Sequence, residues 1–365
     1  MKNTGIYVHI PFCASRCNYC NFLSIGDADA EVKEKYTKAL IEEIRAKAEG
    51  KADTVYLGGG TPTALSLLQI LRVIDALRPY TDKNTEFTIE ANPKTVDKHY
   101  LYKLEDAGVN RISFGMQSTN DGVLKKLGRT HTYADFWDTY NAAQDAGFNN
   151  INVDLISAVP FAEKEKDDIH RLINISPSHI SAYSLSIENG TNFEGLTAVS
   201  DEVDRAKYAY IKEELQNAGY EWYEISNFAK NGKYSRHNTA YWTRKSYIGV
   251  GLGAHSFDKE KSVRYSNVTE LETYLSEENK IAETTEITRT DAMAEFFFLG
   301  LRLIRGVSLH DFYDEFGVSA ESIYGGVFDN LLKHRLIHKE GGVIRLTDYG
   351  VDVSNTVFTE FIQSN

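Results

Sequence analysis

Short runs rich in β-branched residues alternate with helical stretches through the first half of the chain, and this alternation restricts the fold more than any other feature. It is typical of a parallel sheet whose neighbouring strands are joined by crossover helices. Two expected helices, at 97–107 and 133–146, end before a glycine that can take a left-handed cap. The expected strands cover residues 6–10, 54–57, 85–89, 109–114, 151–156 and 179–185. Six strands are too few for a closed eight-stranded barrel, so we predict an open, partial parallel βα barrel.

All three cysteines of the chain, Cys13, Cys17 and Cys20, lie in one short window directly after the first expected strand. Four thiolates normally hold a cluster of four irons, so three would leave one iron free to bind a small ligand. Two other interpretations stay open: a zinc knuckle that takes His9 as its fourth ligand, and unliganded structural cysteines. We favour a 4Fe-4S cluster, because the polar residues between the cysteines indicate a loop rather than a buried element.

Polar groups also follow the other expected strands, at the edge where βα barrels carry their chemistry. They are Gly58, Gly59, Gly60 and Thr61 after the second strand, Glu90 after the third, Gln117 after the fourth and Asp154 in the fifth. Consecutive glycines let the backbone approach a ligand closely, although a tight turn would also explain them. The carboxylates suit the vicinal hydroxyls of a ribose, or they could cap helix N-termini. We therefore expect a cofactor site on this rim.

The second half of the chain is less regular. Residues 220–229 are expected to add one strand, and the barrel with its extension is expected to cover residues 1–257. A charged, weakly apolar span at 258–289 indicates a connector. Residues 290–365 contain amphipathic helices followed by a short hairpin pattern with a Gly341-Gly342 turn, which predicts a small C-terminal helical domain resembling a winged helix.

The composition limits the classes of partner. The chain has 365 residues and a formal net charge of -12, which opposes nonspecific binding to nucleic acid. No apolar run approaches the length of a membrane span, and the N-terminus begins directly in a strand rather than in a signal peptide. Clustered cysteines without separate pairs make disulfides unexpected. We predict a cytoplasmic protein with no membrane span and no nucleic-acid partner.

The cysteine spacing, with Tyr7 before it and Tyr19 within it, resembles the radical S-adenosylmethionine (SAM) superfamily. In that superfamily SAM chelates the open iron, and an electron from the reduced cluster splits it to give a 5′-deoxyadenosyl radical. Further motifs resemble the oxygen-independent coproporphyrinogen III oxidase-like group: YVHIPFC from Tyr7, GGGTPT from Gly58, EANP from Glu90, SFGMQS from Ser113 and LGR from Leu127.

That resemblance implies roles for individual residues. A 4Fe-4S cluster would bind Cys13, Cys17 and Cys20, and SAM would contact Tyr7, Tyr19, Gly59, Gly60, Thr61, Glu90, Gln117, Arg129 and Asp154. One position departs from the group. Its members usually continue the fifth strand into Gly-Leu-Pro, whereas this chain has Ala158-Val159-Pro160.

Two members of the group compete: the oxidase HemN and the haem chaperone HemW. Oxidases have a fourth cysteine one residue after the third, whereas this chain continues with Asn21 and Phe22. Oxidases also carry a long N-terminal arm, whereas residues 1–5 alone precede the first expected strand here. Finally, residues 237–242 match the HNxxYW motif that is associated with haem binding in the chaperones. The resemblance therefore favours HemW.

The HNxxYW motif also has a physical interpretation. The neutral imidazole of His237 is a standard axial ligand for haem iron, and Tyr241 and Trp242 offer flat apolar area to the macrocycle. Asn238 is expected to orient the imidazole through a hydrogen bond. The alternative is a buried, hydrogen-bonded histidine beside core aromatic residues.

We expect a haem chaperone that binds haem and transfers it to acceptor proteins, and that carries a 4Fe-4S cluster with exchangeable SAM. The first alternative is an oxygen-independent coproporphyrinogen III oxidase, a dehydrogenase whose activity we do not expect. The second is a metal-sensing DNA-binding regulator that uses the C-terminal domain. The acidic net charge and the lack of a basic recognition helix argue against the regulator.

Overall fold

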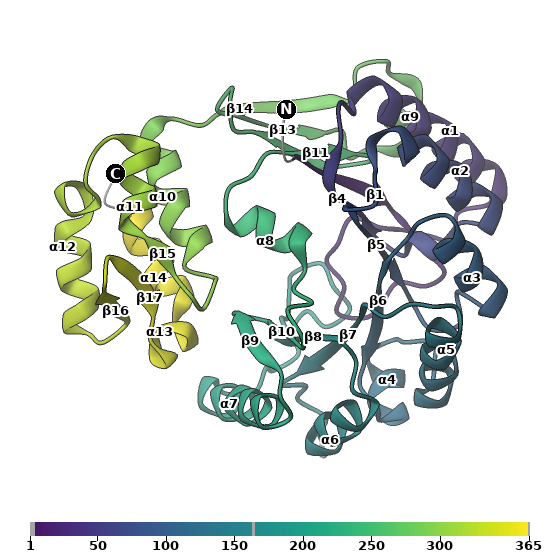
Figure 1. Cartoon of the computed structure of the whole chain (residues 1–365). Coiled ribbons are helices and arrows are strands. Elements are labelled where there is room, and N and C mark those ends of the chain that lie inside the picture. The colour runs from purple at the N-terminus through teal and green to yellow at the C-terminus, as the bar shows by residue number, and fades with distance from the viewer. Residues whose placement is uncertain (1–3, 163–164, 364–365) are drawn as a thin grey trace.

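One twelve-stranded sheet forms the centre of the protein. The structure is a computed structural model that describes residues 4–162 and 165–363. The strand order is β14-β13-β12-β11-β1-β4-β5-β6-β7-β8-β10-β9. Its seven middle strands run parallel: β11 (Tyr247–Val250), β1 (Thr4–Ile10), β4 (Ala52–Gly59), β5 (Glu86–Ala91), β6 (Arg111–Gln117), β7 (Ile151–Ser157) and β8 (His179–Ser184). They curve into an open arc with helices along its outer side (Figure 1).

The predicted open parallel βα barrel is confirmed. Each of the six expected strands is present, with ends that differ by a few residues from the prediction. The seventh parallel strand, β11, was not predicted, because Gly249, Gly251 and Gly253 give its surroundings the composition of a loop. β11 nevertheless pairs with β1, placing Ile248 opposite Ile6, and both side chains are buried.

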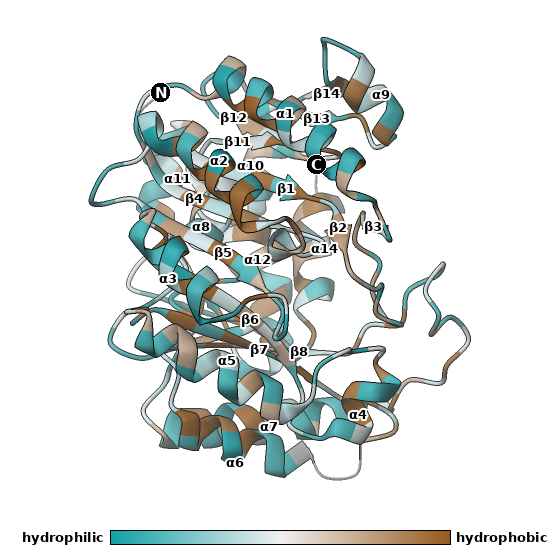
Figure 2. Ribbon diagram, turned by 90° about the vertical axis from the view of Figure 1, so that its right-hand side faces the viewer, coloured by the Kyte–Doolittle hydropathy of each residue, from teal (hydrophilic) through white to brown (hydrophobic). Residues whose placement is uncertain are grey.

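Capping residues set the ends of the outer helices. They are α1 (Ala30–Lys47), α2 (Leu67–Leu77), α3 (Lys98–Asp106), α4 (Asp121–Lys126), α5 (Tyr133–Asp145), α6 (Glu165–Ile175) and α7 (Asp201–Asn217). Ser66 and Thr132 form capping boxes at α2 and α5. Gly108 and Gly147 follow α3 and α5 with φ of 100° and 106°, so the predicted glycine stops are confirmed. Figure 2 shows many apolar residues on the strands and on the helices that cover them.

Two segments extend the sheet beyond the parallel strands. Residues 220–229, expected as one strand, form the antiparallel hairpin β9 (Glu221–Glu224) and β10 (Asn227–Ala229) beside β8. The segment expected as a connector contains β13 (Val263–Asn267), α9 (Leu271–Ser276) and β14 (Ile281–Glu286), next to β12 (His255–Asp258). β13 and β14 pair with the sheet, so this segment contributes its edge. The division at residues 257 and 289 stays a prediction.

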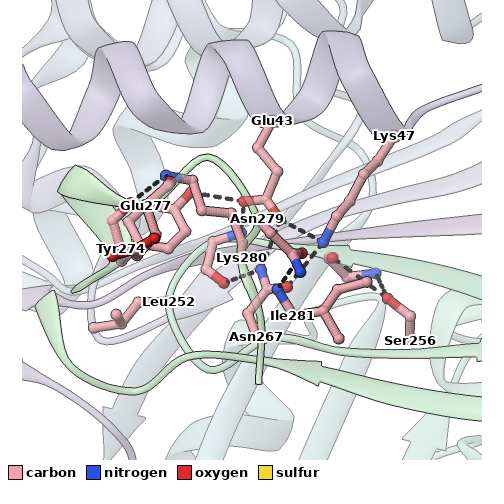
Figure 3. Close-up of polar contacts among 12 residues, drawn as sticks. Glu43, Lys47, Leu252, Ser256, Asn267, Tyr274, Glu277, Asn279, Lys280 and Ile281 are labelled. Atoms are coloured by element: carbon pink, nitrogen blue, oxygen red, sulfur yellow. Dashed lines mark hydrogen bonds and ion pairs between the residues drawn. The ribbon is translucent and has the colours of Figure 1, made fainter. Parts of the chain in front are cut away.

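A buried carboxylate holds that edge against the barrel. Glu43 of α1 is 5% exposed and forms an ion pair with Lys47 at 2.7 Å. It also accepts hydrogen bonds from Asn267 Nδ2 at 2.7 Å, Tyr274 Oη at 2.7 Å and the backbone N–H of Gly251 at 2.8 Å. Figure 3 shows Glu43 and Lys47 reaching from α1 towards Asn267 and Tyr274. These contacts connect three segments that are distant in sequence.

The short helix α8 (Arg236–Trp242) lies inside the arc (Figure 1). Ser235 caps it, and the Glu86 carboxylate of β5 accepts the backbone N–H groups of Arg236 and His237, both at 3.0 Å. The helix therefore has a fixed position against the amino ends of the strands.

The C-terminal segment forms a second hydrophobic core. Its helices are α10 (Arg289–Gly300), α11 (Leu309–Phe316), α12 (Ala320–Lys333), α13 (Asp348–Asp352) and α14 (Ser354–Gln363), and its three-stranded sheet is β15 (Val307–Ser308), β17 (Val343–Leu346) and β16 (Ile337–Glu340). Phe297 and Phe361 stack in the core with ring centres 4.7 Å apart. Helices with a small hairpin confirm the predicted domain.

Arg244, directly after α8, connects this domain to the barrel. Its guanidinium is buried and donates to Glu295 of α10 at 3.2 Å and to Glu315 of α11 at 2.6 Å. Over residues 4–162 and 165–363, no helix has the length and apolar character needed to cross a membrane.

Candidate functional site

The three cysteines lie on one loop at the carboxyl edge of the sheet. Cys13 ends β2 (Phe12–Cys13), and Cys17 and Cys20 follow before β3 (Ile25–Gly26). The backbone N–H of Cys20 donates to the carbonyl of Cys17 at 3.2 Å, which folds the loop back on itself. All three side chains are free, half-buried thiols that line one cavity of about 330 Å³.

Polar neighbours approach two of these sulfur atoms. Arg129 Nη1 donates to Cys17 Sγ at 3.4 Å, and Thr61 Oγ1 lies 3.8 Å from Cys13 Sγ. Burial raises the pKa of the Cys13 and Cys20 thiols, which therefore keep their protons more readily than free thiols. A metal that binds them would have to compensate the charge of the thiolates. The donor set, three thiols on one loop with a cation beside one of them, fits a cluster that carries negative charge.

A zinc knuckle with His9 does not fit this geometry. The imidazole bonds Tyr7 Oη through Nδ1 and the Leu23 carbonyl through Nε2, both at 3.0 Å. Across the described part of the chain, no three His, Cys, Asp or Glu side chains converge on a point where a single ion would sit. The thiolates of a multi-iron cluster bind different irons, so that requirement does not apply to them.

The glycine run after β4 passes very close to the cysteine loop. A Cβ atom on Gly60 would lie 2.7 Å from the carbonyl oxygen of Pro11 and 2.8 Å from that of Phe12. Gly59 has φ +116°, and a Cβ there would meet the His9 ring at 2.7 Å. Only glycine fits at both positions. The close approach of the two loops therefore requires glycine at these positions. Gly59, Gly60 and Thr61 also line the cavity, so their backbone is accessible to a ligand.

Gln117 reaches the cavity through an irregular strand end. The pairing of β6 with β7 shifts register between Gly115 and Gln117, and Gln117 has φ 70°. A bulge of this kind redirects a side chain, and a non-glycine residue in the left-handed region is strained. Tyr183 Oη donates to Gln117 Oε1 at 3.4 Å, which holds the redirected side chain against the cavity wall.

The two carboxylates in the cavity do not cap helices. Glu90 accepts from Tyr56 Oη at 2.7 Å and from the Gly59 backbone at 3.3 Å, and Asp154 accepts from Asn152 Nδ2 at 2.7 Å. Burial raises the pKa of Glu90 to about 7 and raises that of Asp154 as well. Both side chains are half-buried acceptors, which could accept hydrogen bonds from a ligand that bears hydroxyl groups.

Several cavity residues were missed by the sequence analysis. The walls and floor also contain Tyr56, Arg111, Ser113, Asn152, Ser181, Tyr183, Asn227 and Asn238. The sequence contained a signal for them, because polar side chains alternate with apolar ones in the first half of β6, β7 and β8 and so point to one face. These alternating residues are Arg111 and Ser113, Asn152 and Asp154, and His179 and Ser181. Arg111 is 2% exposed, and its Nε finds no hydrogen-bond partner among the residues that the structure describes.

The structure brings together all the predicted cluster and SAM residues except Tyr7. Tyr7 lies behind the cavity wall, where its ring stacks on Tyr56 with centres 6.2 Å apart. Arg129 lines the cavity and also donates to Asn92 Oδ1 at 2.5 Å and to the Gly115 carbonyl at 2.6 Å. These bonds fix its position between the cysteine loop and the sheet.

His237 occupies a separate, buried position. Its Nδ1 lies 2.8 Å from Thr54 Oγ1, and its Nε2 lies 2.8 Å from Tyr241 Oη. The expectation that Asn238 orients the imidazole is wrong, because Thr54 and Tyr241 hold both ring nitrogens while Asn238 faces the cavity. Burial lowers the pKa of His237 to about 3. In this arrangement His237 is the buried, hydrogen-bonded histidine of the alternative interpretation.

The remaining aromatic residue of the motif faces the C-terminal domain. The guanidinium of Arg302 lies 4.3 Å from the centre of the Trp242 ring, and Trp242 lines a groove of about 420 Å³ between α8 and that domain. Trp242 also lines a second pocket of about 290 Å³ together with Tyr241, Tyr247 and Phe257.

Comparisons with known proteins decide the family. Residues 7–173 match the model of the radical SAM superfamily, and residues 287–353 match the HemN C-terminal domain. The protein named heme chaperone HemW from Lactococcus lactis subsp. lactis is 36% identical over 99% of this chain and 98% of its own length. The chain belongs to the HemW family. The HemW protein of Bacillus subtilis is 34% identical over 98% of both chains.

A solved structure supports the fold. Coproporphyrinogen III oxidase (HemN) from Escherichia coli, a radical SAM enzyme, has a TM-score of 0.85 at 20% identity, covering 98% of this chain and 90% of that one. The predicted membership of the HemW group is confirmed, and so is the predicted radical SAM fold. The HNxxYW segment falls between the two matched models, within residues 174–286. Neither matched family model therefore includes this segment.

Proposed function

We propose that this chain is a cytoplasmic haem chaperone, which binds haem and passes it to acceptor proteins. The observation that carries the proposal is similarity along the whole chain to relatives named heme chaperone HemW. The three unpaired thiols support a reducing compartment. Haem and the acceptor proteins are then its partners.

Cys13, Cys17 and Cys20 would hold a 4Fe-4S cluster, with SAM at its open iron as an exchangeable cofactor. Such a pair supplies one-electron chemistry when bound. Arg129 places a positive charge beside Cys17, where it would attract a negatively charged cluster. The bare backbone at Gly59 and Gly60 leaves room for an amino acid moiety, and Glu90 and Asp154 offer acceptors for ribose hydroxyls. Tyr19, Thr61 and Gln117 complete the walls.

His237 would ligate the haem iron. Its low pKa keeps the imidazole neutral at physiological pH, which is the form that binds iron. Ligation requires one of its two hydrogen bonds, to Thr54 or to Tyr241, to open. Loss of one such bond costs about 1 kcal/mol, which an iron–nitrogen bond offsets.

Haemin titration of the anaerobically purified protein tests this function, read beside iron and sulfide analysis. We expect one haem per chain, four irons and four sulfides per cluster, and transfer of bound haem to an added apo-haemoprotein. Coproporphyrinogen III should remain unconverted under reducing conditions with SAM. Conversion of that substrate would support the oxidase alternative, and a protein with zinc or without sulfide would overturn the cluster assignment.

A further inference from the structure

One buried cation in the SAM cavity has no role in the proposed cofactor site. Arg111 lines this cavity and is 2% exposed, and its guanidinium forms no hydrogen bond or ion pair with any residue that the structure describes. Arg129 lines the same cavity, but it donates to Cys17, Asn92 and the Gly115 carbonyl. A buried charge without a partner destabilises the folded state, so Arg111 indicates a ligand.

Arg111 lies at the deep end of the cavity. It is the first residue of β6, and the cavity is lined by every second residue of this strand, namely Arg111, Ser113, Gly115 and Gln117. At a rise of about 3.3 Å per residue, the Cα atoms of Arg111 and Gln117 are about 20 Å apart. None of the predicted cluster and SAM residues lies at the amino end of a strand. The cavity therefore reaches deeper into the barrel than these residues do.

The helix α8 closes the same end of the cavity. Glu86 of β5 accepts its first backbone N–H groups, and Asn238 of this helix lines the SAM cavity. The side-chain amide of Asn238 has no hydrogen-bond partner in residues 4–162 and 165–363. We call Arg111 and Asn238 the cavity floor. Both offer donors that the described chain leaves unused, so a ligand at the floor should bring acceptor oxygens.

The surrounding charges favour a ligand group with a single negative charge. Burial raises the pKa of Glu90 and of Asp154, and the positive charge of Arg111 lowers both, so the two carboxylates lie within its electrostatic reach. They would repel a phosphate dianion more strongly than a monoanion. A carboxylate carries one charge, and its two oxygens match the planar guanidinium of an arginine in a bidentate pair.

We propose that the cavity floor is a carboxylate-binding subsite, in which Arg111 pairs with the acid group of a second ligand and Asn238 supplies a further donor. The second ligand is a carboxylic acid that lies beneath SAM in the same cavity. This inference rests on the proposed function for the rest of the cavity, because SAM would occupy the part lined by Gly59, Gly60 and Gln117.

The first test uses acetate as a probe with one carboxylate. Melting temperatures of the anaerobically reconstituted chain, with and without SAM, are measured in sodium acetate and in sodium chloride of equal ionic strength. Acetate should raise the melting temperature, because a ligand that binds only the folded state stabilises it. Sodium phosphate of the same ionic strength should raise it less. If acetate and chloride gave the same melting temperature, the proposal would be wrong.

Variants of Arg111 locate the bound acetate. Arg111→Met removes the charge, so its dissociation constant for acetate should be at least about tenfold higher than that of the original chain. Arg111→Lys keeps the charge without the planar fork and should bind acetate with an intermediate affinity. An equal affinity in the original chain and in Arg111→Met would place the acetate elsewhere and overturn the proposal.

The sign of the stability change separates ligand binding from a structural role. In chloride alone, Arg111→Met should melt no lower than the original chain, because it removes a buried charge that has no partner. Arg244→Met is the matched control, since Arg244 is equally buried but bonds Glu295 and Glu315. This control should melt at least about 5 °C lower. A loss of that size in Arg111→Met, or its failure to fold, would show that Arg111 is structural.

Binding of labelled SAM, measured by equilibrium dialysis, distinguishes this inference from the proposed function. If SAM binds but acetate has no specific effect, the carboxylate subsite is wrong and the cofactor proposal stands. If acetate binds through Arg111 but SAM does not bind, the subsite stands and the cofactor proposal is wrong.

Discussion

The rings of Tyr56 and His237 stack with their centres 5.1 Å apart. The hydroxyl of the same tyrosine donates to Glu90 in the SAM cavity at 2.7 Å. One side chain of β4 therefore touches the candidate haem ligand with its ring and a candidate SAM residue with its hydroxyl. The two positions are adjacent in space, although they use different residues.

Because the two sites use different residues, Cys17 should be needed for the cluster and His237 for haem ligation. Cys17→Ser should abolish the absorbance of the cluster, because serine is a poor iron ligand, while haemin binding largely survives. His237→Ala should remove the histidine-ligated haem spectrum and leave the cluster intact. Anaerobic absorption spectra with iron analysis measure both. If either change removed both groups, the two-site arrangement would be wrong.

Gly60→Ala should prevent correct assembly of the cluster loop. The added Cβ would overlap the backbone of Pro11 and Phe12, which cannot move without displacing β1 and β2. Gly26→Ala is the matched control, since nothing lies within 4 Å of the Cβ that it adds beside the same loop. Iron and sulfide content after anaerobic reconstitution should fall severalfold in the first variant only. Equal content in both would refute the steric argument.

Glu90 should make stability depend on pH. The folded protein keeps its proton up to about pH 7, whereas the unfolded chain releases it near pH 4.5, so the folded state loses stability as pH rises between these values. Glu90→Gln does not titrate. Relative to the original chain, its free energy of unfolding should rise between pH 4.5 and pH 7 by about 3 kcal/mol at most. Urea unfolding without SAM measures this, and a difference independent of pH would contradict it.

Ala158 occupies the position where the related group usually has glycine, and its φ is 57°. Left-handed backbone costs an alanine about 1 to 2 kcal/mol, so Ala158→Gly should relieve strain that offsets the lost methyl burial. We expect its free energy of unfolding to stay within about 0.5 kcal/mol of the original. The equally buried Ala143 in α5 is the control, and Ala143→Gly should cost about 2 kcal/mol. Equal losses would show that Ala158 is unstrained.

Glu43 should be required for the edge of the sheet formed by β13 and β14. Glu43→Ala leaves Lys47 without its buried partner and removes acceptors from Asn267 and Tyr274, so we expect a loss of about 3 kcal/mol in the free energy of unfolding. Glu43→Gln retains one acceptor and should lose less. Hydrogen exchange should show the loss of protection concentrated at 263–286. Unchanged exchange there would exclude this role.

The sequence alone determined the parallel sheet and the cluster loop. The signals for both are local in sequence, so they can be recognised without coordinates. They are the alternating apolar runs, the glycines that end helices after Ala107 and Ala146, and the spacing of the three cysteines. The strand-end residues, such as Glu90 and Asp154, followed from topology, because parallel strands bring their carboxyl ends to one edge.

Other features depend on contacts between segments that are distant in sequence, and only the tertiary structure shows these. The sequence of β11 is typical of a loop, yet the segment forms a strand because it pairs with β1. His237 reads as an open metal ligand, yet Thr54, distant in sequence, buries and bonds it. The cavity of about 500 Å³ at the amino ends of the strands is lined by lysines from separate segments, and no local pattern indicates that Lys83 and Lys245 border the same cavity. Local chemistry sets where elements begin and end, whereas burial and pairing between distant segments set what each side chain can do.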